Sequence, residues 1–190
     1  MPSPRISLRP FEASDLDALQ AVMGNPEVMR FSLSGPKTRT ETEDFIKRCR
    51  AQYDEFGYSL LAVVDQAENR VIGYCGLYRQ EIEGRMELEI GYRLHPGYWG
   101  RGIATEAARM IRDSAFANLD QERLISIIEP ENAASIAVAK KLGMNFEREF
   151  LFKGQRTAYI YAVRKTKGSN QPSPKPRAVI PPARQGGRQL

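Results

Sequence analysis

A glycine-rich segment at residues 98–105 has the composition of a phosphate-binding turn, and it lies between a predicted strand and a predicted helix. The first turn of a helix has unpaired backbone N–H groups and the positive end of the helix dipole, so it attracts phosphate. Gly100 and Gly102 have no side chain to keep a phosphate away from these amides. Ala104 lets the first turn come close, and Arg101 adds a fixed positive charge. The segment therefore predicts a seat for a pyrophosphate group.

Two other kinds of phosphate-binding turn are compared with this segment. A Walker-type loop requires Gly-Lys-Ser/Thr, and the segment has no lysine. A dinucleotide fingerprint requires a third glycine where Thr105 stands. An acid, Glu129, follows the next predicted strand and favours that alternative, but the strand at 87–92 is too polar for the centre of a parallel sheet. A nucleotide-dependent oxidoreductase therefore stays open as the less favoured alternative.

Other reactive side chains are few. His95 is the only histidine and precedes a proline, which favours a loop role and argues against a serine triad. Cys49 and Cys75 have no metal-ligand spacing, and one pair of cysteines does not make a disulfide scaffold. We therefore expect two reduced thiols and no bound metal. Glu89 shares a strand face with Glu87, and such paired carboxylates are usually solvated unless one of them is buried.

The periodicity of apolar residues predicts a mixed α/β sheet. Helix starts are predicted at Ser14 and Thr40, each with an acid three residues later. Gly84 and Gly154 mark turns between successive strands. Strands are expected at 5–9, 60–64, 71–78, 86–94, 124–128, 146–152 and 157–163. The longer helices are expected at 41–55, 103–117 and 133–142. A single strand–helix–strand–helix unit after a meander argues against a doubly wound sheet.

Charge and composition divide the chain of 190 residues, which has a net charge of +5, into a body and a tail. Residues 1–164 carry 22 basic and 23 acidic side chains, whereas 165–190 carry six basic and no acidic ones. We expect 1–164 to be one domain and 165–190 to be a disordered, basic, Pro/Gly-rich tail. Weak contact of this tail with RNA or an acidic partner is left open. Neither a signal peptide nor a membrane-length apolar run is present, so a soluble, cytoplasmic protein without a membrane partner is expected.

Six motifs, in this order and spacing, resemble the GNAT acetyltransferases, specifically the RimJ/RimL branch of ribosomal-protein N-terminal acetyltransferases. The motifs lie at 5–11, 25–29, 89–92, 98–107, 131–135 and 141–144. The resemblance implies the GNAT acyl-CoA N-acyltransferase fold, in which a central strand splays from its neighbour. It also implies transfer of an acetyl group from acetyl-CoA to a primary amine, on a protein N-terminus or a small molecule, with a homodimer left open. A non-catalytic CoA-binding or interaction module is the alternative.

The resemblance also implies site residues. Glu89 takes the place of the general base, and Asn132 that of a contact to the cofactor arm. The pantetheine groove falls on the strand edge at Tyr92, Arg93 and Leu94. The pyrophosphate loop falls on Gly100, Arg101, Gly102, Ile103, Ala104 and Thr105.

The sequence departs from the wider family at two positions. Trp99 stands at the first loop position, where many members have Gln or Arg; packing under the loop and contact with substrate are both open for it. Ala139 stands where many members have a tyrosine that protonates the leaving thiolate. Ser135 is the candidate substitute in that role, with a helix-start hydroxyl as its simpler interpretation. Phe31 is a candidate for lining the acceptor pocket, with core packing as the alternative.

Overall fold

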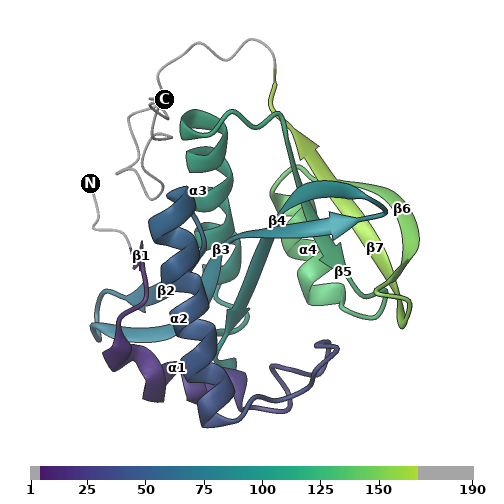
Figure 1. Cartoon of the computed structure of the whole chain (residues 1–190). Coiled ribbons are helices and arrows are strands. Elements are labelled where there is room, and N and C mark those ends of the chain that lie inside the picture. Colours follow the sequence, from purple (N-terminus) through teal and green to yellow (C-terminus); the bar gives the residue numbers. More distant parts are fainter. Residues whose placement is uncertain (1–4, 167–190) are drawn as a thin grey trace, which may run out of the picture.

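The computed structural model describes residues 5–166, which form one mixed seven-stranded sheet in the order β1-β2-β3-β4-β5-β7-β6 (Figure 1). The strands are β1 (Ile6–Arg9), β2 (Leu60–Asp65), β3 (Arg70–Ile82), β4 (Arg85–Leu94), β5 (Arg123–Ile128), β6 (Asn145–Phe152) and β7 (Arg156–Arg164). The helices are α1 (Leu16–Met23), α2 (Arg39–Phe56), α3 (Ile103–Asn118) and α4 (Ala133–Lys141), with short 3-10 turns η1 (Ala13–Asp15) and η2 (Pro96–Tyr98). The expected mixed α/β sheet is confirmed. Most of the predicted tail, from residue 167 on, lies outside the described residues.

The first helical segment begins earlier than predicted. Glu12, rather than Ser14, is the N-cap of η1, and its side chain and that of Asp15 each bond to the other's backbone N–H. Arg9 holds the same Asp15 carboxylate with two guanidinium hydrogen bonds of 2.7 and 2.8 Å. The predicted cap at Ser14 with Asp17 was therefore wrong. The ion pair with Arg9 of β1 holds Asp15 in place, so the helix starts with the capping box of Glu12 and Asp15.

The start of α2 is also displaced. The sequence offers two overlapping capping boxes, and the structure uses Thr38 with Glu41 instead of the predicted Thr40 with Glu43. The Glu43 carboxylate instead forms an ion pair of 2.8 Å with Lys47 one turn further along. The Glu41 carboxylate of the earlier box also forms an ion pair of 3.1 Å with Lys37, which supports the helix start at Thr38.

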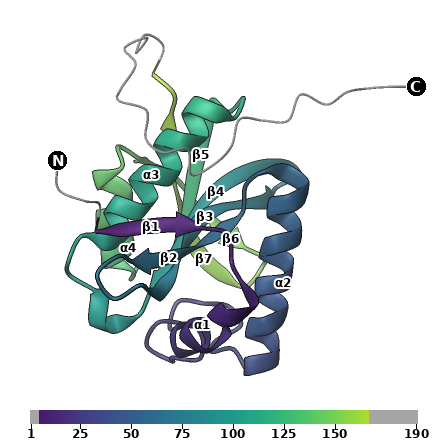
Figure 2. The ribbon, with the colours of Figure 1, turned by 90° about the vertical axis from the view of Figure 1, so that its left-hand side faces the viewer.

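Helices cover both faces of the sheet, with α2 and α3 on opposite sides of β1–β4 (Figure 2). The side chains of Leu60, Ala62 and Tyr74 pack toward α1 and α2. The alternate side chains of the same strands, Leu61 and Cys75 among them, pack with Ile90 of β4 against the apolar faces of α3 and α4. This alternation is what a half-buried strand requires on each face, and it leaves β4 at the centre of the sheet with helices above and below.

The sheet opens between β4 and β5, its only parallel pair over the described residues, and the two strands are paired at Glu89 and Ile125 alone. In Figure 1 these strands run apart toward the bottom of the view. One parallel pair in a seven-stranded sheet is unlike a doubly wound fold, so the topology does not support a nucleotide-dependent oxidoreductase. No helix within residues 5–166 is long and apolar enough to cross a membrane.

Candidate active site

Two side chains replace regular backbone partners at the point where β4 and β5 separate. Continued parallel pairing would join the Ile127 N–H to the Ile90 carbonyl. Instead the Ser126 hydroxyl donates to that carbonyl at 3.0 Å, and the Ile127 N–H donates to a Glu89 carboxylate oxygen at 3.4 Å. Past this point the N–H and C=O of Tyr92 face the open edge of β4, since backbone groups alternate sides along a strand. An extended chain can pair with this edge as an added strand does.

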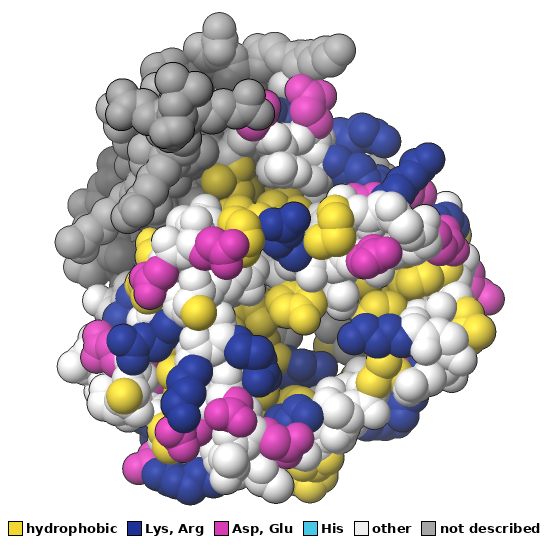
Figure 3. Space-filling model, viewed as in Figure 1, with side chains coloured by type: hydrophobic (Ala, Val, Ile, Leu, Met, Phe, Trp, Pro, Cys, Tyr) yellow, Lys and Arg dark blue, Asp and Glu magenta, His cyan; other side chains and the backbone are white. Residues whose placement is uncertain are grey.

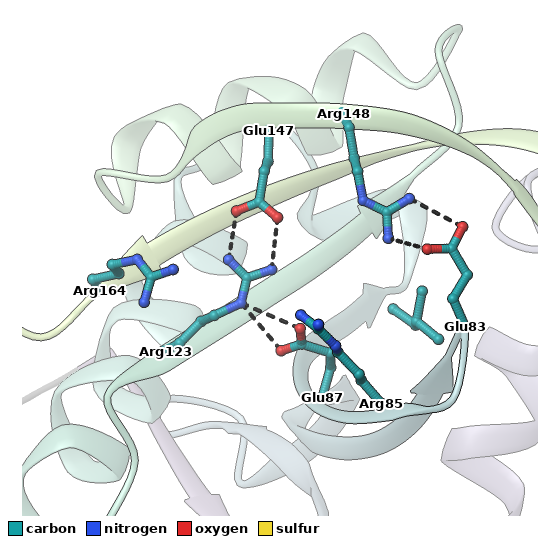
Figure 4. Close-up of a pocket in the computed structure, with 8 residues that line it drawn as sticks. Glu83, Arg85, Glu87, Arg123, Glu147, Arg148 and Arg164 are labelled. Carbon is teal, nitrogen blue, oxygen red and sulfur yellow. Dashed lines mark hydrogen bonds and ion pairs between the residues drawn. The ribbon is translucent and has the colours of Figure 1, made fainter.

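An ion-pair network closes the other end of the same strand pair (Figure 4). Arg123 on β5 bonds to Glu87 on β4 at 3.2 Å and to Glu147 on β6 at 2.5 Å, while Arg148 pairs with Glu83 at 2.8 Å. These residues line a hollow of about 560 Å³, and each of its three carboxylates is engaged by a guanidinium. The network therefore ties β4, β5 and β6 together, so the splay opens at one end only.

The turn before α3 is built as the sequence predicts. Gly100 and Gly102 have φ of 72° and 77°, in the left-handed region that favours glycine, and an added Cβ would meet nothing within 4 Å at either position. Gly102 is the N-cap of α3 and offers no side chain, so the first helical amides keep their donors for another partner. The Trp99 indole N–H donates to the Leu94 carbonyl at 2.8 Å, which fixes the turn to the end of β4. Trp99 is still 44% exposed.

One cleft of about 950 Å³ runs through the splay and brings the predicted site residues together. It is lined by Phe31, Glu89, Tyr92, Arg93, Leu94, Trp99, Gly100, Gly102, Ile103, Ala104, Thr105, Asn132 and Ser135. Arg101 is the predicted site residue that does not line it. The Arg101 guanidinium instead lies 5.3 Å from the centre of the Tyr98 ring. Thirteen of the fourteen predicted residues therefore share one cleft, and the role of each of them there stays a prediction.

Glu89 is partly buried at the middle of this cleft. Burial raises the pKa of its carboxyl to about 7, against the opposing effects of the Ile127 N–H, Gln80 and the cations Arg93 and Lys153. A general base is most effective when its pKa lies near the working pH. With its pKa at about 7, the Glu89 carboxyl is the group in this cleft whose properties match those of a general base.

The first turn of α4 borders the cleft on the side of α3. The Asn132 side-chain oxygen caps the helix by accepting from the Ser135 N–H at 3.1 Å, so its bonding here is to the helix itself. The Tyr92 hydroxyl donates to the Ser135 carbonyl at 3.1 Å, and burial raises the pKa of this phenol. Ala139 is fully buried and contributes no polar group. The resemblance placed the backbone of Tyr92 in the pantetheine groove. The bond of its hydroxyl to Ser135 was not predicted, because it joins residues 43 positions apart in the sequence.

Arg93 lies on the opposite face of β4 from Tyr92, by strand alternation. Its guanidinium donates to the Tyr74 hydroxyl at 2.6 Å, on the side of the sheet covered by α1 and α2. The cleft on this side is also lined by Phe31, from the segment between α1 and α2, and by Gln52 of α2. The splay thus has two sides: one bordered by α3 and α4, the other by α1, α2 and the segment between them.

Of the two cysteines, Cys49 lines the cleft and Cys75 does not. Both thiols are buried, and burial raises the pKa of Cys49 to about 12 and that of Cys75 as well. A thiol with a raised pKa carries little of the thiolate that acts as a nucleophile. Among residues 5–166 no three His, Cys, Asp or Glu side chains are grouped as metal ligands.

Comparison with known proteins gives a consistent result. The family described as "Acetyltransferase (GNAT) domain" matches residues 5–145. The uncharacterised protein YkkB of Bacillus subtilis is 34% identical, over 76% of this chain and 84% of its own length. The spermidine N(1)-acetyltransferase of Escherichia coli is 29% identical, over 82% of this chain and 83% of its own. The crystal structure of a GNAT-family acetyltransferase from Bacillus anthracis aligns with a TM-score of 0.74 at 25% identity, over 86% of this chain and 96% of that one.

Proposed function

The chain belongs to the GNAT acetyltransferase family, and from that premise we propose that it moves the acetyl group of acetyl-CoA directly to a primary amine of a small molecule or a protein N-terminus. The observation that carries this proposal is the position of Glu89, whose carboxylate lies at the point where β4 and β5 separate, in a cleft of about 950 Å³. A base at this point lies between the two sides of the splay. The motif pattern further favours the RimJ/RimL branch.

The residues on the α3 side fit acetyl-CoA. The first-turn amides of α3 behind Gly100 and Gly102 suit its pyrophosphate, since the space an added Cβ would fill is empty. The free edge of β4 at Tyr92 and Leu94 suits its extended arm, which carries amide groups of its own. Asn132 borders the same path. When bound, acetyl-CoA supplies an acetyl thioester that an amine can attack.

The residues on the α2 side suit the amine. An ammonium ion is not a nucleophile, so the acceptor must lose a proton before it attacks. Glu89, with its pKa raised to about 7, takes that proton directly or through a water molecule. The Ile127 N–H donates to one of its oxygens, and the Gln80 side chain also hydrogen-bonds to the carboxylate.

The leaving thiolate needs a proton donor or a hydrogen bond. The Ser135 hydroxyl borders the cleft, and we add the Tyr92 hydroxyl as a second candidate because it lies against the same helix turn. The two are separable by Ser135→Ala and Tyr92→Phe. The variant that lowers turnover while keeping CoA affinity identifies the donor.

The decisive test measures binding and transfer separately. Calorimetry should show that CoA binds to the full chain. When a primary amine is added to the protein with acetyl-CoA, the free thiol of CoA should be released. Glu89→Gln should keep the CoA affinity and lose most of the turnover, whereas Glu149→Gln, an exposed residue of β6 outside the cleft, should change neither. CoA binding without thiol release for any primary amine would favour the alternative, a non-catalytic CoA-binding module.

A further inference from the structure

The acceptor side of the cleft carries more positive than negative charge. Arg30, Arg48, Arg93 and Lys153 line it, and none of them forms an ion pair within residues 5–166. The remaining cation of the β6–β7 turn, Arg156, is neutralised by Glu129 at 2.8 Å. The unpaired carboxylates along the same lining are Glu27 and Glu89. The excess of cations is therefore two, before Glu89 accepts a proton.

Arg93 is the most informative of these cations. Its guanidinium is partly buried between β4 and α2, yet its one hydrogen bond in the structure goes to a neutral phenol, that of Tyr74. A guanidinium has five N–H donors and is costly to bury without a negative partner. Tyr74 raises the pKa of Arg93, and so does the negative charge that Glu89 supplies nearby, but that charge is lost when Glu89 accepts a proton. Over the described residues no fully buried side-chain nitrogen lacks a hydrogen-bond partner, so the remaining Arg93 donors face the cleft.

The other cations surround the same opening. The Arg30 guanidinium lies 5.2 Å from the centre of the Phe31 ring, and the Lys153 ammonium lies 5.4 Å from that of Phe152. Arg48 projects from the exposed part of α2. Figure 3 shows dark blue Lys and Arg side chains around the hollow near the centre of this face. Stacking on aromatic rings holds a cation in place while its charge stays available.

We propose that the acceptor amine carries an anionic group, a carboxylate or phosphate, which Arg93 binds with the help of Arg48 and Arg30. The inference rests on the proposed acetyl transfer and names the class of acceptor. Arg93 and Glu89 point to the same face of β4 four residues apart, so the anion and the amine bind at separate places along one strand. Nearby cations also favour the neutral form of the amine, which is the form that reacts.

The proposal excludes a polycation as the preferred substrate. The excess of two positive charges around the opening disfavours spermidine, because like charges brought together in an interface are costly. The similarity to a spermidine acetyltransferase therefore does not extend to the acceptor. An acidic peptide N-terminus and an acidic amino acid share the required chemistry.

The test compares matched acceptors with the full chain and acetyl-CoA, measured by thiol release. One arm uses peptides with the same N-terminal residue followed by acidic, neutral or basic residues; the second uses glutamate and glutamine; the third uses spermidine. We expect kcat/KM for an acidic acceptor to exceed that of its neutral counterpart by about tenfold or more, and this advantage to shrink with added salt. The arm that reacts identifies a protein N-terminus or an amino acid as the source.

Variants assign the effect to the named residues. Arg93→Gln and Arg48→Gln should each raise KM for the acidic acceptor by about tenfold or more. Arg48→Gln should change kcat little, whereas Arg93→Gln also removes a cation that lowers the pKa of Glu89 and should shift the pH profile of kcat to higher pH. Arg50→Gln, an exposed position on α2 outside the cleft, is the matched control and should behave as wild type. Arg48 is exposed, so its variant tests the idea even where Arg93→Gln unfolds the protein.

The outcomes separate the two levels of inference. Preference for spermidine, or equal rates for acidic and neutral acceptors, would overturn the anionic acceptor and leave acetyl transfer intact. Thiol release with none of the amines would remove both proposals together.

Discussion

Replacing Glu89 by Gln should make the protein more stable at alkaline pH while abolishing most of its activity. Glutamine keeps the shape and the oxygen that accepts from the Ile127 N–H, so the splay stays intact. What it removes is a carboxyl whose pKa rises from 4.5 to about 7 on folding, with burial as the main cause. A raised acid pKa means that the folded protein binds this proton more tightly than the unfolded chain does.

The size of the effect follows from the two pKa values. Between pH 4.5 and about 7 the unfolded chain has lost a proton that the folded protein retains, so wild-type stability falls as pH rises through this window and then levels off. A shift of this size corresponds to roughly 3 kcal/mol. The Glu89→Gln variant has no carboxyl to titrate here and does not lose this stability. The difference in free energy of unfolding, variant minus wild type, should therefore increase by roughly 2 to 3 kcal/mol from about pH 5 to about pH 8.5.

Urea denaturation of both proteins at the two pH values measures this difference. Glu149→Gln, exposed on β6, is the control and should differ from wild type by less than about 0.5 kcal/mol at either pH. In parallel, wild-type turnover should rise with pH through an apparent pKa of about 7, and the variant should lose about a hundred- to ten-thousandfold in rate. A variant that is equally destabilised at both pH values would refute the assignment of Glu89 as a desolvated base.

Three further predictions concern the loop and the thiols. Gly102→Val should lower CoA affinity at least about tenfold, by crowding the phosphate seat. Gly84→Val, at a similar φ of 78° with equally open space, should cost the same roughly 1–2 kcal/mol of backbone strain without changing affinity in calorimetry. Trp99→Phe should cost about 1 kcal/mol in thermal unfolding and raise KM for acetyl-CoA, because the Leu94 carbonyl loses its donor; an unchanged KM would mean that the loop needs no such anchor. Iodoacetamide should label Cys49 and Cys75 only after unfolding, as mass spectrometry would show, and should leave native activity intact.

Local patterns were enough to predict most of the fold. The alternation that predicts the strand at 86–94 and the glycines that end its following turn both act over a few residues, and the structure confirms them in β4 and in the start of α3. Helix starts failed where two registers compete: Thr38 and Thr40 are equally good caps by sequence. The structure uses Thr38, whose partner Glu41 also pairs with Lys37, and the competing Glu43 pairs with Lys47 within the helix.

The long-range contacts of the site could not be predicted in this way. Glu89 was assigned through a family motif, and nothing in its neighbours along the chain shows that Ile127 donates to it across 38 residues. The bonds of Tyr92 to Ser135 and of Arg93 to Tyr74 likewise join separate elements. Each of these contacts depends on the order and register of the strands, which decide which side chains of different elements lie next to one another. For that reason the sequence predicted which residues share the cleft but not the charges that line its α2 side.

The opening of the sheet and the basicity of Glu89 have a common physical origin. The Ile127 N–H needs an acceptor, and in a regular sheet the Ile90 carbonyl would supply it. Because the Ser126 hydroxyl already donates to that carbonyl, the Glu89 carboxylate takes its place. The exchange stops strand pairing at this point and holds a carboxylate inside the sheet, where burial raises its pKa. In the proposed mechanism, the carboxylate that replaces the Ile90 carbonyl at the opening is also the group that accepts the proton, so Glu89 would act as a base without closing the opening in which it acts.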